Sequence, residues 1–306
     1  MSLAPRCSNL LKTRLDRFTH MLPGVDNGDE RALHRARVAT RRLREIVPVL
    51  QLDADATDKL SRRLRKITRR LGDVRELDVM LSVINELRHS QPAHADALTR
   101  VAAVVTKARD EARADRAERL PLESLERVAH KLDRVVQTLR RAEDDRQDRR
   151  RPARARTASW AIDARVVRRA ERLREALNDA TAVYLPERLH GVRIALKKLR
   201  YAGELSNSFG QKNLAPSLRT LKRAQDILGR MHDLQVLIDR VREVQASLMP
   251  PNLAVWRHMD ALVVALDEMC RVLHARFLRV QPSVESVVHR LTAEGARTLH
   301  RERQAG

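Results

Sequence analysis

Aromatic residues are scarce in this chain of 306 residues. It contains three Phe, two Tyr and two Trp, which together make up 2% of its length. Proteins that bind single-stranded nucleic acids stack the bases on aromatic side chains, so this composition argues against RRM-like and OB-fold architectures. It leaves open recognition of a duplex by its phosphates alone, and it favours a partner without bases.

Cysteines and long apolar runs are also lacking. Only Cys7 and Cys270 occur, and the pair gives neither a metal-ligand spacing nor a disulfide framework, as is typical of a reducing compartment. No apolar stretch has the length of a signal peptide or of a membrane span, so we expect a cytoplasmic protein with no membrane partner.

Sequence patterns of enzymes and metal sites are missing as well. The chain has no GxxxxGK[ST], no GxGxxG and no HExxH pattern, and its carboxylates are scattered instead of grouped to hold Mg²⁺. We therefore predict a protein that is not an enzyme and that needs no metal and no cofactor.

Acidic residues are too few to balance the basic ones. Lys and Arg number 61 and Asp and Glu 40, for a formal net charge of +21. Hydrophobic residues make up 43% of the chain, enough for a core, so the charge does not indicate disorder. Because self-repulsion of this size costs stability, we infer that the charge serves a polyanionic partner.

Glycine and proline, at nine and eleven residues, fall mainly between periodic apolar segments. Long helices joined by short turns are expected from this pattern, and no strand-like alternation occurs, so we predict an all-α fold. Gly72 and Gly229 are expected to end helices, with Glu76 and Asp233 capping the next ones. The expected helices cover about 6–22, 29–51, 55–71, 74–90, 94–118, 121–144, 159–183, 186–208, 214–228, 230–248, 252–279 and 283–303.

Two stretches half a chain apart share one pattern. Residues 34–44 read HRARVATRRLR, and residues 190–201 read HGVRIALKKLRY, at an offset of 156 residues. A second pair, residues 71–79 and 228–236, follows at an offset of 157. These matches indicate an internal tandem repeat, which we divide into residues 1–145, an Arg-rich linker at 146–157, and residues 158–306. The linker is either solvated or an additional anion-binding arm.

On a helix, each repeated stretch has a basic face opposite an apolar face. Acidic residues that would offset the repulsion are missing from the basic face, and like charges one turn apart destabilise a helix by a few tenths of a kcal/mol per pair. A bound polyanion would compensate. A second basic patch consists of Arg65, Lys66 and Arg69, and Lys222 and Arg223 are its counterpart in the second repeat. If the helices pack by their apolar faces, the basic faces can line one cleft.

His34 and His190 stand at the start of the two basic faces. Without a second histidine at i+4, metal ligation is improbable, and donation from an imidazolium to a phosphate is the simpler role. Both are therefore interpreted as ligand contacts.

The four stretches resemble the signature of the CHAD family, the conserved histidine alpha-helical domain. Carrying the resemblance are HxxRVATRRLR from His34, LGxxRExD from Leu71, HxxRIAxKKLRY from His190 and LGxxHD from Leu228. The resemblance implies two tandem, pseudo-symmetric helical bundles of the four-helix type, with a basic cleft between them that binds inorganic polyphosphate without known catalysis.

Combining this resemblance with the basic faces gives a set of expected polyphosphate-binding residues: His34, Arg37, Arg41, Arg42, Arg44, Arg65, Lys66, Arg69, Arg75, His190, Arg193, Lys197, Lys198, Arg200, Tyr201, Lys222 and Arg223. Two alternatives stay open. One is a nucleoid-associated protein that binds DNA or RNA through phosphates, and the other is an adaptor that uses the same cleft at polyphosphate granules, where localisation would be expected.

Overall fold

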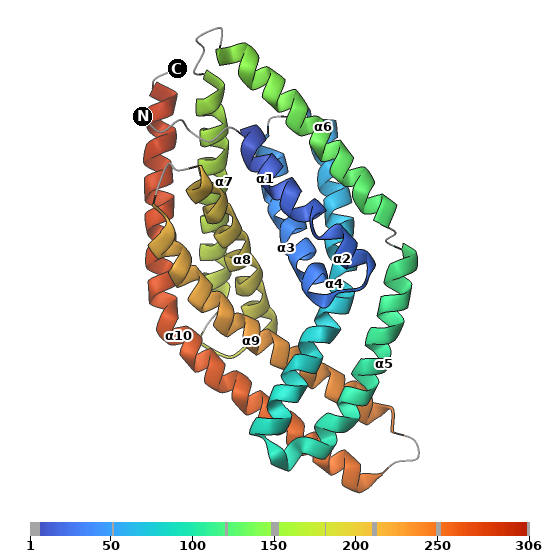
Figure 1. Ribbon diagram of the computed structural model, residues 1–306. Helices are drawn as coiled ribbons and strands as arrows, with labels where there is room; N and C mark the ends of the chain where they lie inside the picture. The colour runs from blue at the N-terminus through green and yellow to red at the C-terminus, as the bar shows by residue number, and fades with distance from the viewer. Residues whose placement is uncertain are drawn as a thin grey trace.

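The computed structural model describes residues 7–50, 52–119, 122–147, 153–180, 182–209, 213–248 and 252–304. All regular elements in these ranges are helical, which confirms the all-α prediction (Figure 1). They are α1 (Cys7–Thr19), α2 (Leu22–Asp26), α3 (Glu30–Ile46), the 3₁₀ turn η1 (Val47–Val49), α4 (Ala54–Ser90), the 3₁₀ turn η2 (Pro92–His94), α5 (Ala95–Arg119), α6 (Leu122–Gln147), α7 (Ala153–Asp179), α8 (Pro186–Ser208), α9 (Ala215–Ala246) and α10 (Leu253–Gln304).

Aspartate caps fix the starts of α3 and α4. The Asp29 carboxylate accepts hydrogen bonds from the backbone N–H groups of Arg31 and Ala32, and Gly28 turns the chain just before it with a φ of 75°. Asp53 likewise accepts from the N–H of Ala56. Each such cap contributes about 1 kcal/mol to helix stability. The first repeated stretch therefore lies on a helix whose start is determined locally.

Three expected helix ends are wrong. α4 runs through Gly72, α9 through Gly229, and α10 through Pro282. Among the described glycines only Gly28 has a positive φ, so neither Gly72 nor Gly229 forms a left-handed helix end. Glu76 and Asp233 consequently lie in the middle of helices, and their predicted role as capping acids is wrong too.

The Arg-rich segment between the repeats is shorter than the predicted linker. α6 extends to Gln147 and α7 begins at Ala153, earlier than the expected start near residue 159. Arg149, Arg150 and Arg151 lie outside the described residues.

Apolar side chains gather into two cores that share α4. One core joins α1, α2, α3, α6 and the first half of α4, where Leu64 and Leu71 are buried, and it also includes Ile162 of α7 and Leu205 of α8. The other joins α5, α7, α8, α9, α10 and the second half of α4, where Ile84 is buried. The division of the chain into two bundles, with bounds at 145 and 158, stays a prediction.

The helices that carry the repeated stretches meet at the centre of the molecule. α3 contacts α8, and α4 contacts α9 where the two long helices cross (Figure 1). The basic faces of both repeats are thereby brought to one place. Within the described ranges, no helix combines the length and the apolar character that crossing a membrane requires.

Candidate functional site

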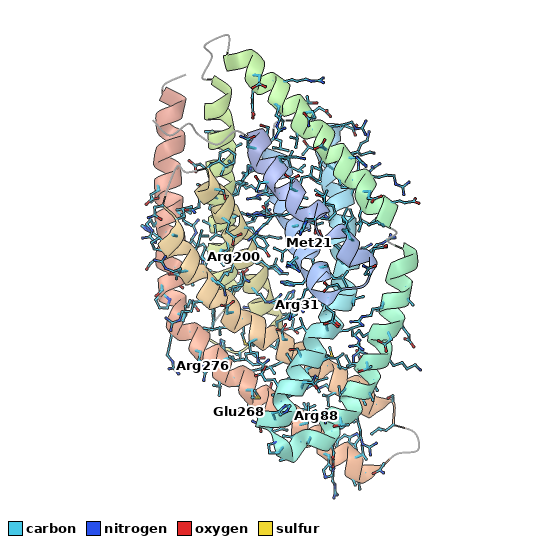
Figure 2. The ribbon with its side chains drawn as sticks, viewed as in Figure 1. Met21, Arg31, Arg88, Arg200, Glu268 and Arg276 are labelled. Carbon is cyan, nitrogen blue, oxygen red and sulfur yellow. The ribbon has the colours of Figure 1, made fainter. Side chains whose placement is uncertain are left out.

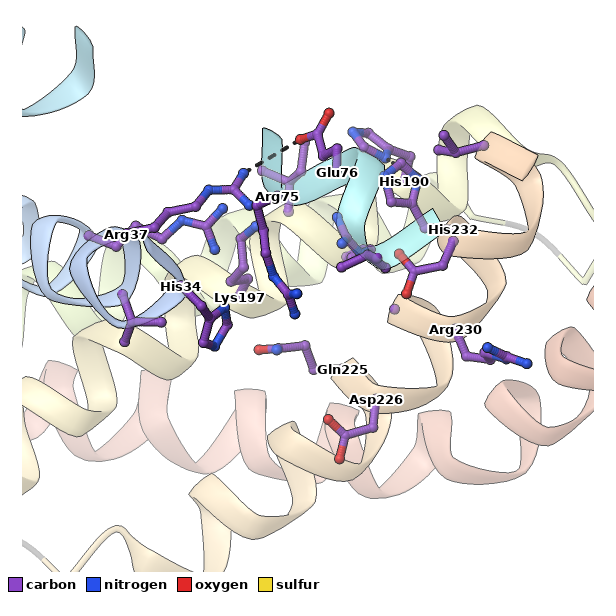
Figure 3. A pocket seen from close by; sticks show the side chains of 18 of the residues that line it. His34, Arg37, Arg75, Glu76, His190, Lys197, Gln225, Asp226, Arg230 and His232 are labelled. Atoms are coloured by element: carbon purple, nitrogen blue, oxygen red, sulfur yellow. Dashed lines mark hydrogen bonds and ion pairs between the residues drawn. The ribbon is translucent and has the colours of Figure 1, made fainter. Parts of the chain in front are cut away.

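A cleft of about 760 Å³ lies between α3 and α4 of the first repeat and α8 and α9 of the second (Figure 3). In this view Glu76 of α4 lies at one edge and Asp226 of α9 at the opposite edge. Nine of the predicted site residues line the cleft: His34, Arg37, Arg41, Arg75, His190, Arg193, Lys197, Arg200 and Tyr201.

The other eight predicted residues lie outside this cleft. On the first repeat, Arg42 faces Glu204 with 3.7 Å between their charged atoms, and Arg44 is half-buried, with its pKa lowered by burial and by nearby Arg65. Three more are exposed on the first half of α4: Arg65, Lys66 and Arg69.

On the second repeat, Lys198 lies with Arg169 and Arg172 along a groove of about 240 Å³ between α7 and α8. Lys222 and Arg223 line a different groove, between α9 and α10. The cleft therefore brings together residues from the basic faces of α3 and α8. The second basic patch of each repeat lies outside it.

Positive charge exceeds negative charge in the cleft. Its lining has three carboxylates, Glu76, Asp226 and Asp233. Against these stand seven basic side chains besides histidine: Arg37, Arg41, Arg75, Arg193, Lys197, Arg200 and Arg230.

Three of the seven cations have acidic partners. Arg37 Nη2 lies 3.5 Å from Glu76 Oε1, the contact drawn as a dashed line in Figure 3. Arg200 pairs with Glu204 and donates to Gln225 Oε1 at 2.8 Å, and Arg230 pairs with Glu86 on α4 at 2.7 Å. In the described part of the chain, no ion pair is formed by the remaining four: Arg41, Arg75, Arg193 and Lys197.

The ammonium group of Lys197 is the most perturbed cation of the cleft. Burial, followed by repulsion from Arg41, Arg193 and Arg37, lowers its pKa to about 7. Desolvation and like charges both disfavour the charged form of an amine. The free cleft therefore holds Lys197 near its point of half-protonation at neutral pH.

Histidines from three elements face the cleft. His190 and His232 contact each other, with 3.3 Å between their Nδ1 atoms. Burial, Arg193 and His190 lower the pKa of His232 to about 4, and burial also lowers the pKa of His190 and His34. Imidazoles with these lowered pKa values are mainly neutral at pH 7, and an anion bound beside them would favour their protonation.

The Arg37 side chain crosses α4 at Gly72, where no Cβ atom stands in its way. A Cβ atom at position 72 would lie 3.0 Å from Nη2 of Arg37 and 3.3 Å from its Cζ. The glycine therefore lets the guanidinium pass close to the helix backbone and reach Glu76 one turn further on. At Gly229, by contrast, a Cβ would meet no atom within 4 Å.

Several cleft residues were not predicted as site residues: Glu76, Gln225, Asp226, Arg230, His232 and Asp233. All but Glu76 lie on α9, which was expected to break at Gly229. The spacing of Gln225, Gly229, His232 and Val236 follows one face of a continuous helix. Helical periodicity carried through the glycine would have found them.

Among the described residues, no group of three or more His, Cys, Asp and Glu side chains converges as metal ligands would. What the cleft gathers instead is a set of cations that outnumber the acids, with mainly neutral histidines beside them. Such an arrangement suits an anionic ligand that makes several charge-assisted hydrogen bonds.

Comparison with known proteins places this fold. Matching structures include the crystal structure of the CHAD domain from the plant Ricinus communis, with a TM-score of 0.64 and 18% identity over 94% of this chain and 95% of that one. PptA from Streptomyces chartreusis matches with a TM-score of 0.57 and 17% identity over 95% of this chain and 98% of that one. No curated protein matches the chain.

The family pattern of the CHAD domain matches residues 9–242, a segment that contains both repeated stretches and every residue that lines the cleft. The chain belongs to the CHAD family.

Proposed function

We propose that the cleft binds inorganic polyphosphate and holds it without chemical change. One observation carries the proposal: Arg41 and Arg75 of the first repeat and Arg193 and Lys197 of the second converge on one cleft and form no ion pair within the described residues. Asp233 acts on Arg193 only from beyond ion-pair distance. A flexible chain with a charge on every phosphate could contact all four at once. Membership of the CHAD family supports the same ligand class.

Arginine suits this ligand because its planar guanidinium donates two parallel hydrogen bonds to phosphate oxygens and stays charged. The histidines would add donors once protonated, and Lys197 would recover its full charge beside the anion. Binding would thereby relieve the repulsion that the free cleft carries.

The shape of the site favours polyphosphate over a nucleic acid duplex. The cleft is bounded by helices of both repeats and has a volume of about 760 Å³. A thin linear chain can enter such a space, whereas B-DNA, whose major groove alone is about 12 Å wide, would contact only the rim. Aromatic side chains for stacking are limited to Tyr201 in the cleft.

Binding without catalysis follows from the carboxylates. Phosphoryl transfer needs acids grouped to hold Mg²⁺ against the phosphates. Glu76 and Asp226 lie at opposite edges of the cleft (Figure 3), and Asp233 of α9 interacts electrostatically with Arg193. We therefore propose a binding module, with localisation at polyphosphate granules as its expected consequence.

A calorimetric titration with polyphosphate tests this function. We expect Arg41→Gln with Arg193→Gln to lose on the order of 1.5 to 3 kcal/mol of binding free energy per lost charge-assisted contact. The matched control, Arg127→Gln with Arg134→Gln, removes the same charge from the exposed face of α6 and should lose well under 1 kcal/mol. Equal losses in the two variants would contradict the cleft as the binding site.

A further inference from the structure

A second basic groove lies on the other side of α9. It has a volume of about 660 Å³ and runs between α9 and α10. Arg219, Lys222 and Arg223 line it from α9, and Arg276 and Arg279 line it from α10. Figure 2 labels Arg276 near the edge of the molecule, away from Arg200, which marks the cleft. Lys222 and Arg223, which were predicted as ligand contacts, therefore line this groove and not the cleft.

The charge of the groove is almost unopposed. Its lining includes five cations and a single carboxylate, Asp226, whose Oδ2 lies 2.6 Å from Nζ of Lys222. The four arginines are exposed and form no ion pair within the described residues. Like charges at this spacing repel, so the groove, like the cleft, would be stabilised by a bound anion.

A solvated helix face would look different. Some exposed cations of this chain do have an acid one turn away, as in Lys59 with Asp55 and, on α10 itself, Arg271 with Asp267. Arg276 instead has valines four residues before and after it, and Arg219 has Arg223 as its neighbour at i+4. The absence of acids at these positions, together with a concave surface, indicates a place for an anion.

The groove and the cleft adjoin each other. Asp226 lines both, and its side chain stands at the edge of the cleft in Figure 3. On α9 the cleft residues and the groove residues occupy adjacent faces, so a chain that leaves the cleft over Asp226 enters the groove directly.

We propose that the α9–α10 groove is a second polyanion-binding site that continues the cleft and holds the part of a long polyphosphate chain that extends beyond it. Arg219, Arg223, Arg276 and Arg279 contact this part, and Asp226 opposes its passage while it occupies Lys222. The inference rests on the proposed function of the cleft and assigns the protein a preference for long chains.

The test compares tripolyphosphate with long-chain polyphosphate by calorimetry. The groove variant carries four substitutions, Arg219→Gln, Arg223→Gln, Arg276→Gln and Arg279→Gln. The matched control removes four exposed cations from α4 and α6, by Arg62→Gln, Arg63→Gln, Arg127→Gln and Arg134→Gln. Thermal unfolding of both variants verifies that they fold.

We expect the groove variant to keep the tight tripolyphosphate site and to lose about tenfold or more in affinity for the long chain. With about 0.7 counterions released per contact on a single-stranded polyanion, its plot of log affinity against log salt should become shallower by about 3. The control should change neither quantity by more than a small factor. Asp226→Asn, which frees Lys222, should strengthen long-chain binding more than tripolyphosphate binding.

Three results would overturn the inference. Unchanged long-chain affinity in the groove variant would mean that the chain does not enter the groove. An equal loss in the control would mean that net charge alone accounts for the effect. If the wild type bound neither probe, the proposed function of the cleft would fail first and the groove with it.

Discussion

At the scale of single residues, Lys197 carries a cost to the fold that a bound anion would relieve. Its pKa is lowered from an ordinary value of 10.5 to about 7 in the folded protein. Between these two values the unfolded chain binds more protons than the folded one, so stability rises with pH over this window. Below about pH 7 the full cost applies, on the order of 3 to 5 kcal/mol.

We therefore predict that Lys197→Met stabilises the protein and weakens polyphosphate binding. The gain in unfolding free energy should be largest at pH 6, several kcal/mol, and should shrink toward pH 10, where the folded amine is neutral and the unfolded amine, with an ordinary pKa of 10.5, begins to lose its proton. Chemical denaturation across this pH range measures it. A wild type whose stability relative to the variant does not change between pH 6 and pH 10 would show that Lys197 titrates normally.

Proton uptake on binding is the second prediction at this scale. Lys197, His34 and His190 all have lowered pKa values in the free cleft, and a polyanion raises the pKa of each cation that it contacts. Binding should therefore take up protons near pH 7.5 and weaken as pH rises from 6 to 9. Titrations in buffers of different ionisation enthalpy count the protons taken up.

Two variants divide that uptake between its sources. His34→Gln with His190→Gln should remove the part that occurs at the lower pH, and Lys197→Gln the part that occurs above pH 7. If the wild type takes up no protons, the histidines serve only packing and Lys197 lies away from the ligand.

At the scale of elements, two helix-internal glycines provide a matched pair. Both lie in continuous helices, α4 and α9, where glycine costs about 0.5 to 1 kcal/mol relative to alanine. A Cβ at Gly229 meets nothing, whereas one at Gly72 presses on the Arg37 guanidinium. Gly229→Ala should accordingly raise the thermal midpoint by about 1 to 3 °C.

Gly72→Ala should gain less stability than Gly229→Ala, or lose some, and it should also weaken polyphosphate binding because Arg37 is displaced from its path to Glu76. Thermal unfolding and calorimetry of the two single variants measure both effects. Equal stabilisation with unchanged affinity in both would show that Arg37 does not depend on the space above Gly72.

Sequence periodicity predicted the elements well where it was unbroken. The basic faces of α3 and α8 line the cleft because apolar residues that recur with the helical period of 3.6 residues determine which side of each helix is buried. The expected breaks at Gly72, Gly229 and Pro282 failed because the cost of an interior glycine or proline is local, whereas packing along the whole helix offsets it.

Other features of the site depend on contacts that no local pattern contains. Gly72 is required by a side chain from α3, and Lys222 and Arg223 are placed by the packing of α9 against α10. The repeat made them the counterparts of Arg65 and Lys66, but equivalence in sequence did not give equivalence in space, since α10 packs along α9, whereas Arg65 and Lys66 are exposed on α4. Residues of α9 beyond Gly229 were missed for a different reason, because the helix was expected to end at that glycine.

At the scale of the whole molecule, a formal charge of +21 attracts any polyanion, so affinity alone does not identify the partner. Specificity has to come from shape, because the cleft is a concave space of about 760 Å³ between four helices, whereas other basic side chains, such as Arg65 and Lys66, are exposed. The distinction between a polyphosphate-binding protein and a nucleoid-associated protein is therefore a comparison of two polymers at the same salt concentration.

The last prediction makes that comparison. Long-chain polyphosphate should displace duplex DNA of equal phosphate content from the wild type at physiological salt, because the polymer reaches the unpaired cations of the cleft and the duplex reaches only exposed ones. Arg41→Gln with Arg193→Gln should reduce this preference about tenfold or more while leaving DNA binding nearly unchanged. Arg127→Gln with Arg134→Gln should weaken both polymers slightly and keep the preference. Comparable displacement by both polymers in the wild type would mean that the charge of the surface dominates, and the protein would then be better described as a phosphate-backbone binder of nucleic acids.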